Sequence, residues 1–324
     1  PNDAAMAYLA DNHDLIICVD CGTVSHGAIA AAKRADVIIL DHHLASEQLP
    51  NCLAVVNPNR QDENGELSHL CAAAVVFLCL VECGRYLRAK GAHTPNLMEY
   101  LDLVAMATVA DVAPLLGVNR AFVKQGLNIM AKRGRVGIVA LADQANIKSA
   151  PKPYHLGFIF GPRINAGGRV GKASLGARLL VSKNVEEAAG LAEQLEQLNQ
   201  ERRRIEDQVL VEALEQAQKR GFEAPLVWAA GQDWHPGVVG IVATRLKEAS
   251  GRPSIVIGID KGIGKGSGRS INGIDLGVAV QNLAAQGFLL RGGGHKMAAG
   301  LTVEAQNIET AMKKLEVLIA KQGV

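Results

Sequence analysis

The chain has 324 residues, 48% of them apolar and 20% charged, a composition typical of a soluble globular protein with about two domains. Its formal net charge is only +2, so a surface that is basic throughout is excluded and any nucleic-acid-binding surface must be local. No apolar run approaches the roughly 18 residues of a membrane span, which predicts no membrane partner.

All six cysteines lie on apolar patterns rather than in the evenly spaced framework of a small secreted domain, and no secretory signal precedes them. We therefore expect reduced thiols and a cytoplasmic protein. The alternative is a zinc site built from the four best-spaced thiols, which is disfavoured because Cys18 falls in a strand-like run and Cys79 and Cys83 fall in an apolar helix. Those four are Cys18, Cys21, Cys79 and Cys83.

Three short apolar runs, at 15–20, 37–40 and 53–58, predict β-strands, and 25–35 predicts a helix with Ser25 as its N-cap. The runs are continuously apolar rather than alternating, as expected when helices cover both faces of a sheet. Repetition of strand, helix and strand predicts an α/β fold with a parallel, doubly wound sheet.

The middle of the chain is predicted to be helical, with a break. Helices are expected at about 70–90, 97–110 and 119–133, followed by a loop over 142–157. The segment "GFIFGPRINAGGRVG" (157–171) contains too many glycines to predict a regular helix. Residues 184–220 then predict one long helix, which we interpret as a connector.

The remaining residues predict a second, smaller α/β lobe. Its expected strands are 224–231 and 253–259, its helices 236–250, 275–286 and 307–321, and its glycine-rich segments 264–270 and 292–303. The predicted domains are thus 1–183, a connector helix at 184–220, and 221–324.

Acidic and imidazole side chains follow the first two predicted strands. Asp20 ends the first, the sequence Asp41-His42-His43 ends the second, and Asp111 ends a helical run. Ligands of open α/β sheets gather at the carboxyl ends of the strands, and carboxylates with imidazole suit Mn²⁺ or Mg²⁺ better than zinc. This set predicts a metal-dependent phosphoesterase, with Asp41 able to orient a histidine. A capped strand end without metal is the alternative.

The glycine-rich segments of the second lobe carry cationic and hydroxyl side chains. The first holds Lys265, Ser267 and Arg269, and the second is preceded by Arg291 and contains His295. Backbone N–H groups of glycines can approach an anion, so we interpret both as phosphate-binding, with tight turns as the alternative. Arg163 and Arg169 lie in a further glycine-rich stretch, and Trp234 with His235 could stack on a base.

Taken together, these motifs resemble one family. Their order matches that seen in the RecJ family of the DHH phosphoesterase superfamily. The matching stretches are "VDCGT", "DHH", "ATVADVAPL", "GPRINAGGR", "WHPGVVGIVATRLKE", "GKGSGRS" and "GGGHKMAAGL". The resemblance implies a DHH lobe joined by a long helix to a DHH-associated lobe. It also implies 5′-to-3′ exonuclease activity on single-stranded DNA in repair and recombination, with two-metal catalysis by Mn²⁺ or Mg²⁺.

The resemblance also implies roles for individual residues. Asp20 corresponds to the bridging metal ligand, and His42 and Asp111 to ligands of one ion. His43, with Asp41 beside it, corresponds to the histidine that faces the scissile phosphate. The implied substrate-binding residues are Arg163, Arg169, Ser267, Arg269 and His295. The implied partners are single-stranded DNA, a single-strand-binding protein and a RecQ-type helicase.

Two family features have no counterpart in this sequence. No Asp-x-Asp pair precedes Asp20, and no oligonucleotide-binding domain follows residue 324. We therefore expect an internal segment that binds at most one metal well and is weak or inactive in cleavage. Two other functions stay open, a DHH phosphodiesterase acting on short oligonucleotides or cyclic dinucleotides, and a non-catalytic fragment that binds single-stranded DNA.

Overall fold

The structure is a computed structural model that describes residues 1–323. The chain forms two compact units. Unit 1 comprises Pro1–Pro162 and Arg178–Ala192, and unit 2 comprises Arg163–Ala177 and the residues from Glu193 onward. The expected α/β class is confirmed, with a parallel sheet in unit 1 and a mixed sheet in unit 2. Within residues 1–323, no helix combines the length and apolar character needed to cross a bilayer.

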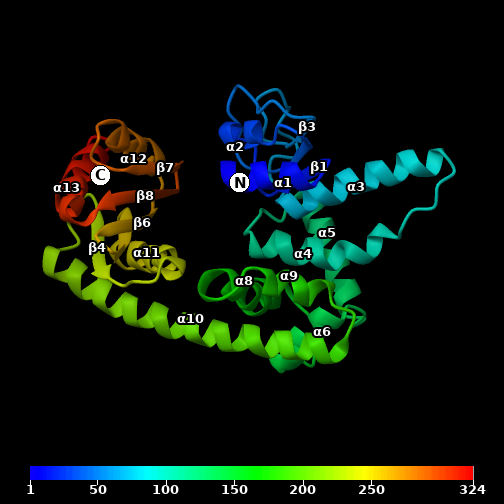
Figure 1. Ribbon diagram of the computed structural model, residues 1–324. Helices are drawn as coiled ribbons and strands as arrows, with labels where there is room; N and C mark the ends of the chain where they lie inside the picture. Colours follow the sequence, from blue (N-terminus) through cyan, green and yellow to red (C-terminus); the bar gives the residue numbers. More distant parts are fainter. Residues whose placement is uncertain (324) are drawn as a thin grey trace. The chain divides into compact units, whose positions relative to one another are not determined.

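The sheet of unit 1 has three parallel strands in the order β1-β2-β3, of which Figure 1 labels β1 and β3. They are β1 (Leu15–Val19), β2 (Asp36–Leu40) and β3 (Ala54–Val56). In the β1–β2 register Val19 lies opposite Leu40, so the residues that follow both strands leave the sheet at the same edge. The polar residues after β1 and β2 are therefore brought together by strand pairing alone.

Helices α1 (Asp3–Asn12) and α2 (His26–Ala31) cover one face of this sheet. Met6 of α1 and Ile29 of α2 pack on Ile16 and Ile39, and all four are buried. The continuous apolar run at 15–19 predicted burial on both faces, but burial alternates along β1. Its outward side chains are about half exposed within the described residues: Leu15, Ile17 and Val19.

The remainder of unit 1 is helical. Its elements are α3 (Ala72–Ala89), η1 (Leu97–Tyr100), α4 (Leu101–Ala110), α5 (Gly117–Met130), α6 (Val136–Gln144), α7 (Pro153–His155) and the π-helical turn η2 (Leu156–Phe160). Helix α9 (Ser174–Val181) belongs to unit 1 only from Arg178 onward. Helices α4 and α5 pack so closely that a Cβ added at Gly126 would lie 2.2 Å from the carbonyl oxygen of Leu101. This contact fixes α4, which carries Asp111 at its end.

The prediction that 157–171 is too glycine-rich for a helix is wrong. The segment forms η2 and then α8 (Gly161–Val170). The glycines are needed for close packing, since a Cβ at Gly157 would meet Val109 at 3.3 Å and one at Gly161 would meet Ala110 at 3.3 Å. The loop expected at 142–157 is also shorter than predicted, because α6 extends to Gln144 and α7 begins at Pro153.

Unit 2 contains a five-stranded sheet in the order β4-β5-β6-β8-β7, with β4 and β5 parallel and the other neighbours antiparallel. The strands are β4 (Val227–Gln232), β5 (Ser254–Asp260), β6 (Ile263–Arg269), β7 (Arg291–His295) and β8 (Ala298–Glu304). One face packs on α11 (Pro236–Ser250) and the later part of α10 (Val185–Arg220). The other face packs on α12 (Leu276–Ala285) and α13 (Ile308–Ala320), with the turn η3 (Ala305–Asn307) preceding α13. The long helix predicted at 184–220 is confirmed as α10.

Candidate metal centre and substrate-binding residues

Strand pairing in unit 1 gathers three side chains at the carboxyl edge of its sheet. Asp20, His42 and His43 each place one ligand atom within 4.8 Å of those of the other two. The closest approach joins Nε2 of His42 to Oδ1 of Asp20 at 3.2 Å. Asp20 is largely exposed, so the cluster opens to solvent.

A hydrogen bond to the backbone fixes the orientation of the His42 ring. Its Nδ1 lies 3.1 Å from the carbonyl oxygen of Leu70, and because a carbonyl only accepts, Nδ1 carries the hydrogen. With the hydrogen on Nδ1, the neutral form of the ring presents the lone pair of Nε2 to the carboxylate of Asp20. Two such electron-pair donors repel unless a proton or a cation lies between them. Neighbouring ligands on an octahedral Mg²⁺ are about 3 Å apart, so the observed spacing fits a divalent ion.

Asp111 follows α4 as its C-cap and approaches the same imidazole. Its Oδ2 lies 3.8 Å from Nδ1 of His42, outside the tighter three-residue group. Burial raises the pKa of the Asp111 carboxyl, His42 opposes this shift, and the negative charge of Asp20 adds to it. A cation between the carboxylates would relieve that repulsion.

Asp41 is only 1% exposed and forms hydrogen bonds to both histidines of the cluster. Its Oδ2 accepts from the backbone N–H of Thr23 (3.1 Å) and the Thr23 hydroxyl (2.7 Å). Its Oδ1 accepts from the backbone N–H of His42 (2.8 Å) and from Nδ1 of His43 (2.7 Å). Burial alone would raise the pKa of Asp41, but the hydrogen bonds from Thr23, His43 and His42 outweigh it and hold the pKa well below its usual range. Asp41 is thus a charged group that orients His43 and leaves the Nε2 of that ring free.

Two buried polar residues of this network were not predicted. The Asn57 side chain donates to the Thr23 hydroxyl (2.9 Å) and to the His43 carbonyl (2.8 Å). Both Asn57 and Thr23 are almost fully buried. A signal was present in the sequence, because Asn57 directly follows β3 and so reaches the same sheet edge as Asp20 and Asp41.

Backbone strain occurs at Asp20 itself and at the residue that follows Asp111. Asp20 has φ 61°, and Val112, which directly follows Asp111, has φ 57°. A positive φ is an outlier for a β-branched residue, and such strain accumulates at functional sites. Val112, next to Asp111, is therefore held in an unfavourable backbone conformation.

We expect Val112→Gly to raise the free energy of unfolding by about 1 kcal/mol, because glycine adopts a positive φ without strain. The Val112 side chain is 86% exposed, so its removal costs little packing. Chemical denaturation of the two proteins measures the difference. Val211→Gly, at an exposed position inside α10, is the control and should destabilise by roughly 0.5 kcal/mol. A Val112→Gly protein less stable than the parent would contradict the strain argument.

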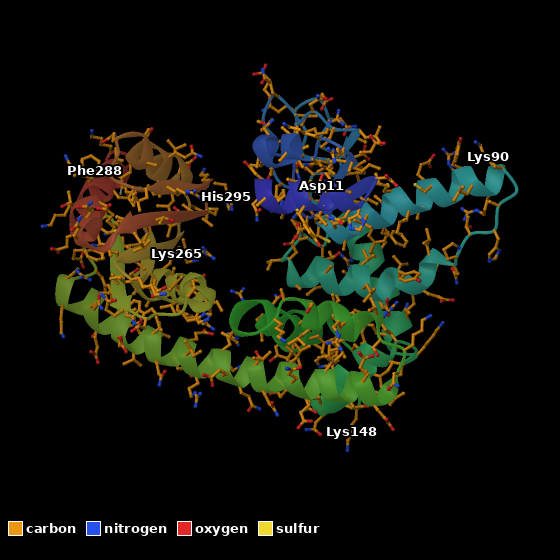
Figure 2. The ribbon with its side chains drawn as sticks, in the orientation of Figure 1. Asp11, Lys90, Lys148, Lys265, Phe288 and His295 are labelled. Atoms are coloured by element: carbon orange, nitrogen blue, oxygen red, sulfur yellow. The ribbon has the colours of Figure 1, made fainter. Side chains whose placement is uncertain are left out.

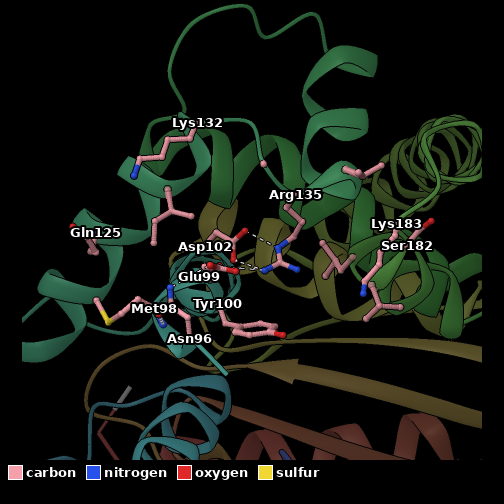
Figure 3. A pocket seen from close by; sticks show the side chains of 15 residues that line it. Asn96, Met98, Glu99, Tyr100, Asp102, Gln125, Lys132, Arg135, Ser182 and Lys183 are labelled. Carbon is pink, nitrogen blue, oxygen red and sulfur yellow. Dashed lines mark hydrogen bonds and ion pairs between the residues drawn. The ribbon is translucent and has the colours of Figure 1, made fainter. Parts of the chain in front are cut away.

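The start of α4 is held by a buried ion pair (Figure 3). Asp102 accepts from Nε (2.6 Å) and Nη2 (3.0 Å) of Arg135, and Nη2 also donates to the Glu99 carbonyl. The pair lines a pocket of about 630 Å³, with Lys132 and Lys183 on either side of it. Helix α4 carries Asp102 in its first turn and Asp111 at its C-cap, so this pair anchors the far end of the helix that ends at Asp111.

In unit 2, three of the predicted substrate-binding residues form a cluster. Nη1 of Arg269 donates to the Ser267 hydroxyl (2.9 Å), and Nη1 of Arg169 donates to the Gly237 carbonyl (3.1 Å). Partial burial, followed by repulsion from Arg169, lowers the pKa of Arg269. Partial burial, followed by repulsion from Arg202, likewise lowers the pKa of Arg169. Arginines held together in this way would gain from a bound anion.

The predicted backbone cradle in "GKGSGRS" is wrong, because this segment is β6, with β5 on one side and β8 on the other. Its N–H groups are therefore engaged in the sheet. Gly266 and Gly268 instead leave room for neighbouring side chains, since added Cβ atoms would meet Leu301 at 2.9 Å and Leu276 at 2.7 Å. The intervening Ser267 lies on the opposite face, where anion binding depends on side chains alone.

The remaining predicted residues have different surroundings. Arg163 forms an ion pair with Glu196 of α10, and both side chains are mostly buried, so this arginine ties α8 to α10. His295 is exposed at the end of β7 (Figure 2). Trp234 does not offer a stacking surface, because it is 6% exposed and its indole N–H donates to Glu212.

Family comparisons define the class of protein first. Residues 2–108 match the DHH family, N-terminal domain, and residues 207–321 match the DHHA1 domain. The match to the first model covers β1, β2 and the cluster of Asp20, His42 and His43, and the match to the second covers the sheet of unit 2. The chain is therefore a DHH-family protein with a DHHA1 domain.

Individual relatives narrow the class. The single-stranded-DNA-specific exonuclease RecJ of Dickeya dadantii is 40% identical over 96% of this chain and 57% of its own length. The Escherichia coli protein of the same name is 39% identical over 95% of this chain and 56% of its own length. The chain spans about half the length of these curated relatives.

Solved structures of RecJ proteins also match this chain. The crystal structure of RecJ from Thermus thermophilus in complex with Mn²⁺ matches with a TM-score of 0.86 and 34% identity, covering 99% of this chain and 47% of that one. A manganese-bound exonuclease RecJ matches with a TM-score of 0.82 and 35% identity, covering 98% of this chain and 78% of that one. The chain belongs to the RecJ family.

Proposed function

We propose that this chain is the catalytic region of an exonuclease that hydrolyses phosphodiester bonds of single-stranded DNA with Mn²⁺ or Mg²⁺. The observation that carries the proposal is the 3.2 Å approach of the His42 Nε2 lone pair to the Asp20 carboxylate, a spacing that fits a divalent ion. Relatives that share 34–35% identity with this chain were solved with manganese or magnesium bound.

Each residue has a proposed part in hydrolysis. Asp20 and His42 hold the ion, and Asp111 adds charge beside them. A divalent ion bound there would polarise the phosphate and lower the pKa of a bound water. Asp41 keeps His43 in one tautomer, so that Nε2 of His43 can exchange a proton with, or hydrogen-bond to, the scissile phosphate.

In unit 2, Arg169, Ser267 and Arg269 are proposed to bind backbone phosphate through their side chains, with His295 as a further contact. Arg163 acts through its ion pair with Glu196, by holding α8 in place. The proposal also includes the 5′-to-3′ direction of degradation, a second metal ion, and a role in DNA repair and recombination. Its proposed protein partners are a single-strand-binding protein and a RecQ-type helicase. The proposed location is the cytoplasm, with which the six free thiols agree.

We expect Asp20→Asn and His42→Ala each to weaken Mn²⁺ binding at least about 100-fold and to abolish the weak hydrolysis expected of this segment, because each removes a ligand atom. Calorimetric Mn²⁺ titration and release of mononucleotides from a 5′-labelled strand measure the two effects. Asp11→Asn, at an exposed ion pair on α1, is the matched control.

Mn²⁺ binding that survives both substitutions would refute the assigned centre. Cleavage of dinucleotides or cyclic dinucleotides in preference to long strands would instead identify a phosphodiesterase of small nucleotides. Strand binding with no hydrolysis at saturating Mn²⁺ would identify a non-catalytic DNA-binding fragment.

A further inference from the structure

Two aromatic side chains of unit 1 are stacked on each other in solvent. The rings of Tyr154 and Phe158 are 5.1 Å apart at an interplanar angle of 24°, and the residues are 61% and 67% exposed. Phe158 is the only exposed phenylalanine in residues 1–323. Large exposed apolar surface of this kind typically marks a binding site.

The pair is carried by an unusual element. Tyr154 lies in α7 and Phe158 in η2, a single π-helical turn. Such turns are rare and frequently occur at functional sites. Here the turn directs Phe158 outward, whereas Leu156 and Phe160 of the same turn are fully buried.

The element also packs directly against the helix that ends at the metal centre. Gly157 and Gly161 contact Val109 and Ala110, the last two residues of α4, and Asp111 follows immediately. The stacked rings and the centre at His42 thus belong to the same unit and are connected through one helix end.

The surroundings suit a nucleic-acid base rather than an apolar protein partner. Lys152, at the N-cap of α7 and two residues before Tyr154, is exposed and adds a cation to the same short segment. The His155 ring is also close, 6.1 Å from that of Tyr154. An aromatic face next to a cation is the combination that binds single strands without sequence preference.

We propose that Tyr154 and Phe158 form a base-stacking platform that holds a nucleotide of the single strand on the unit that carries the candidate metal centre. This inference rests on the proposed function and adds to it a binding site in unit 1. The platform acts on bases, whereas the Arg169, Ser267 and Arg269 cluster acts on phosphate.

The test measures strand binding without cleavage. Fluorescence anisotropy of a labelled oligodeoxythymidylate with the 324-residue chain in EDTA should show binding weakened roughly tenfold to hundredfold in Tyr154→Ala/Phe158→Ala. The Tyr154→Ala/Phe158→Trp variant should bind at the parental level, because the indole restores an aromatic face. The slope of affinity against salt should not change, because no phosphate contact is lost.

Tyr86→Ala, which removes an equally exposed tyrosine from α3, is the matched control and should bind as the parent does. A strand with abasic sites should bind the parent and the double variant equally. The platform is refuted if the double variant binds normally, if the abasic strand shows the same loss, or if the parent binds no strand. If binding depends on both rings but Mn²⁺ produces no hydrolysis, the proposed function fails and the platform stands.

Discussion

Arg135→Ala is expected to lower the free energy of unfolding by about 3–5 kcal/mol, because it leaves the Asp102 carboxylate buried without its charged partner. Asp102 is 2% exposed and accepts two hydrogen bonds from the guanidinium. Urea denaturation measures the loss. The expected size is large because the Asp102 carboxylate, itself only 2% exposed, loses both guanidinium donors that Figure 3 shows.

The contribution of the charge itself can be separated from that of the geometry. Asp102→Leu combined with Arg135→Met removes both charges and should be much less destabilising than Arg135→Ala alone. Arg85→Ala, which breaks an exposed pair with Glu82, is the control and should change stability by less than about 1 kcal/mol. A cost below about 1 kcal/mol for Arg135→Ala would show that Asp102 is not held as described.

The proximity of Asp20 and His42 was predictable because strand pairing leaves little freedom. Each acidic motif directly follows an apolar run, and parallel strands in register bring their carboxyl ends to one edge. Asp20 and His42 are therefore adjacent however the rest of the chain packs. The position of Asp111 was predicted less closely, because it depends on how α4 packs in three dimensions.

The errors arose where tertiary packing overrides local preference. Helix α8 forms despite its glycines because Gly161 has a close neighbour that no sequence pattern reveals. The glycines of β6 similarly serve packing rather than anion binding. Helix α1 escaped prediction because only Met6 and Ala10 of it are buried, too few to produce a periodic signal.

The aromatic residues show a second limit of sequence reasoning. Trp234 stood beside a histidine and a proline and suggested a stacking surface, but it is buried on Glu212. Tyr154 and Phe158 gave no signal, because one fell in a predicted loop and the other in a glycine-rich stretch, where no periodic pattern indicates exposure. Exposure, which decides between these readings, is a property of the fold.

Asp41→Asn is expected to cost about 3–5 kcal/mol of unfolding free energy although it changes only one atom of the side chain. Both carboxylate oxygens accept from N–H donors, Oδ2 from Thr23 and Oδ1 from His42 and His43. Either orientation of an asparagine amide therefore directs its NH₂ group at another donor. Thr23→Val, which removes only a hydroxyl, is the matched comparison and should cost about 1–2 kcal/mol.

The pH dependence of stability tests the same network independently. The pKa of Asp41 is lower in the folded protein than its ordinary value of about 3.9, so the folded state binds the proton less readily than the unfolded state. Its ionised form therefore contributes stability above about pH 4, and this contribution disappears as the pH falls further. The Asp41→Asn protein lacks this ionisation, so the stability difference between the two proteins should narrow between about pH 4 and pH 2. A constant difference over that range would show that the carboxylate of Asp41 is not selectively stabilised in its charged form, and would remove the basis for its role in orienting His43.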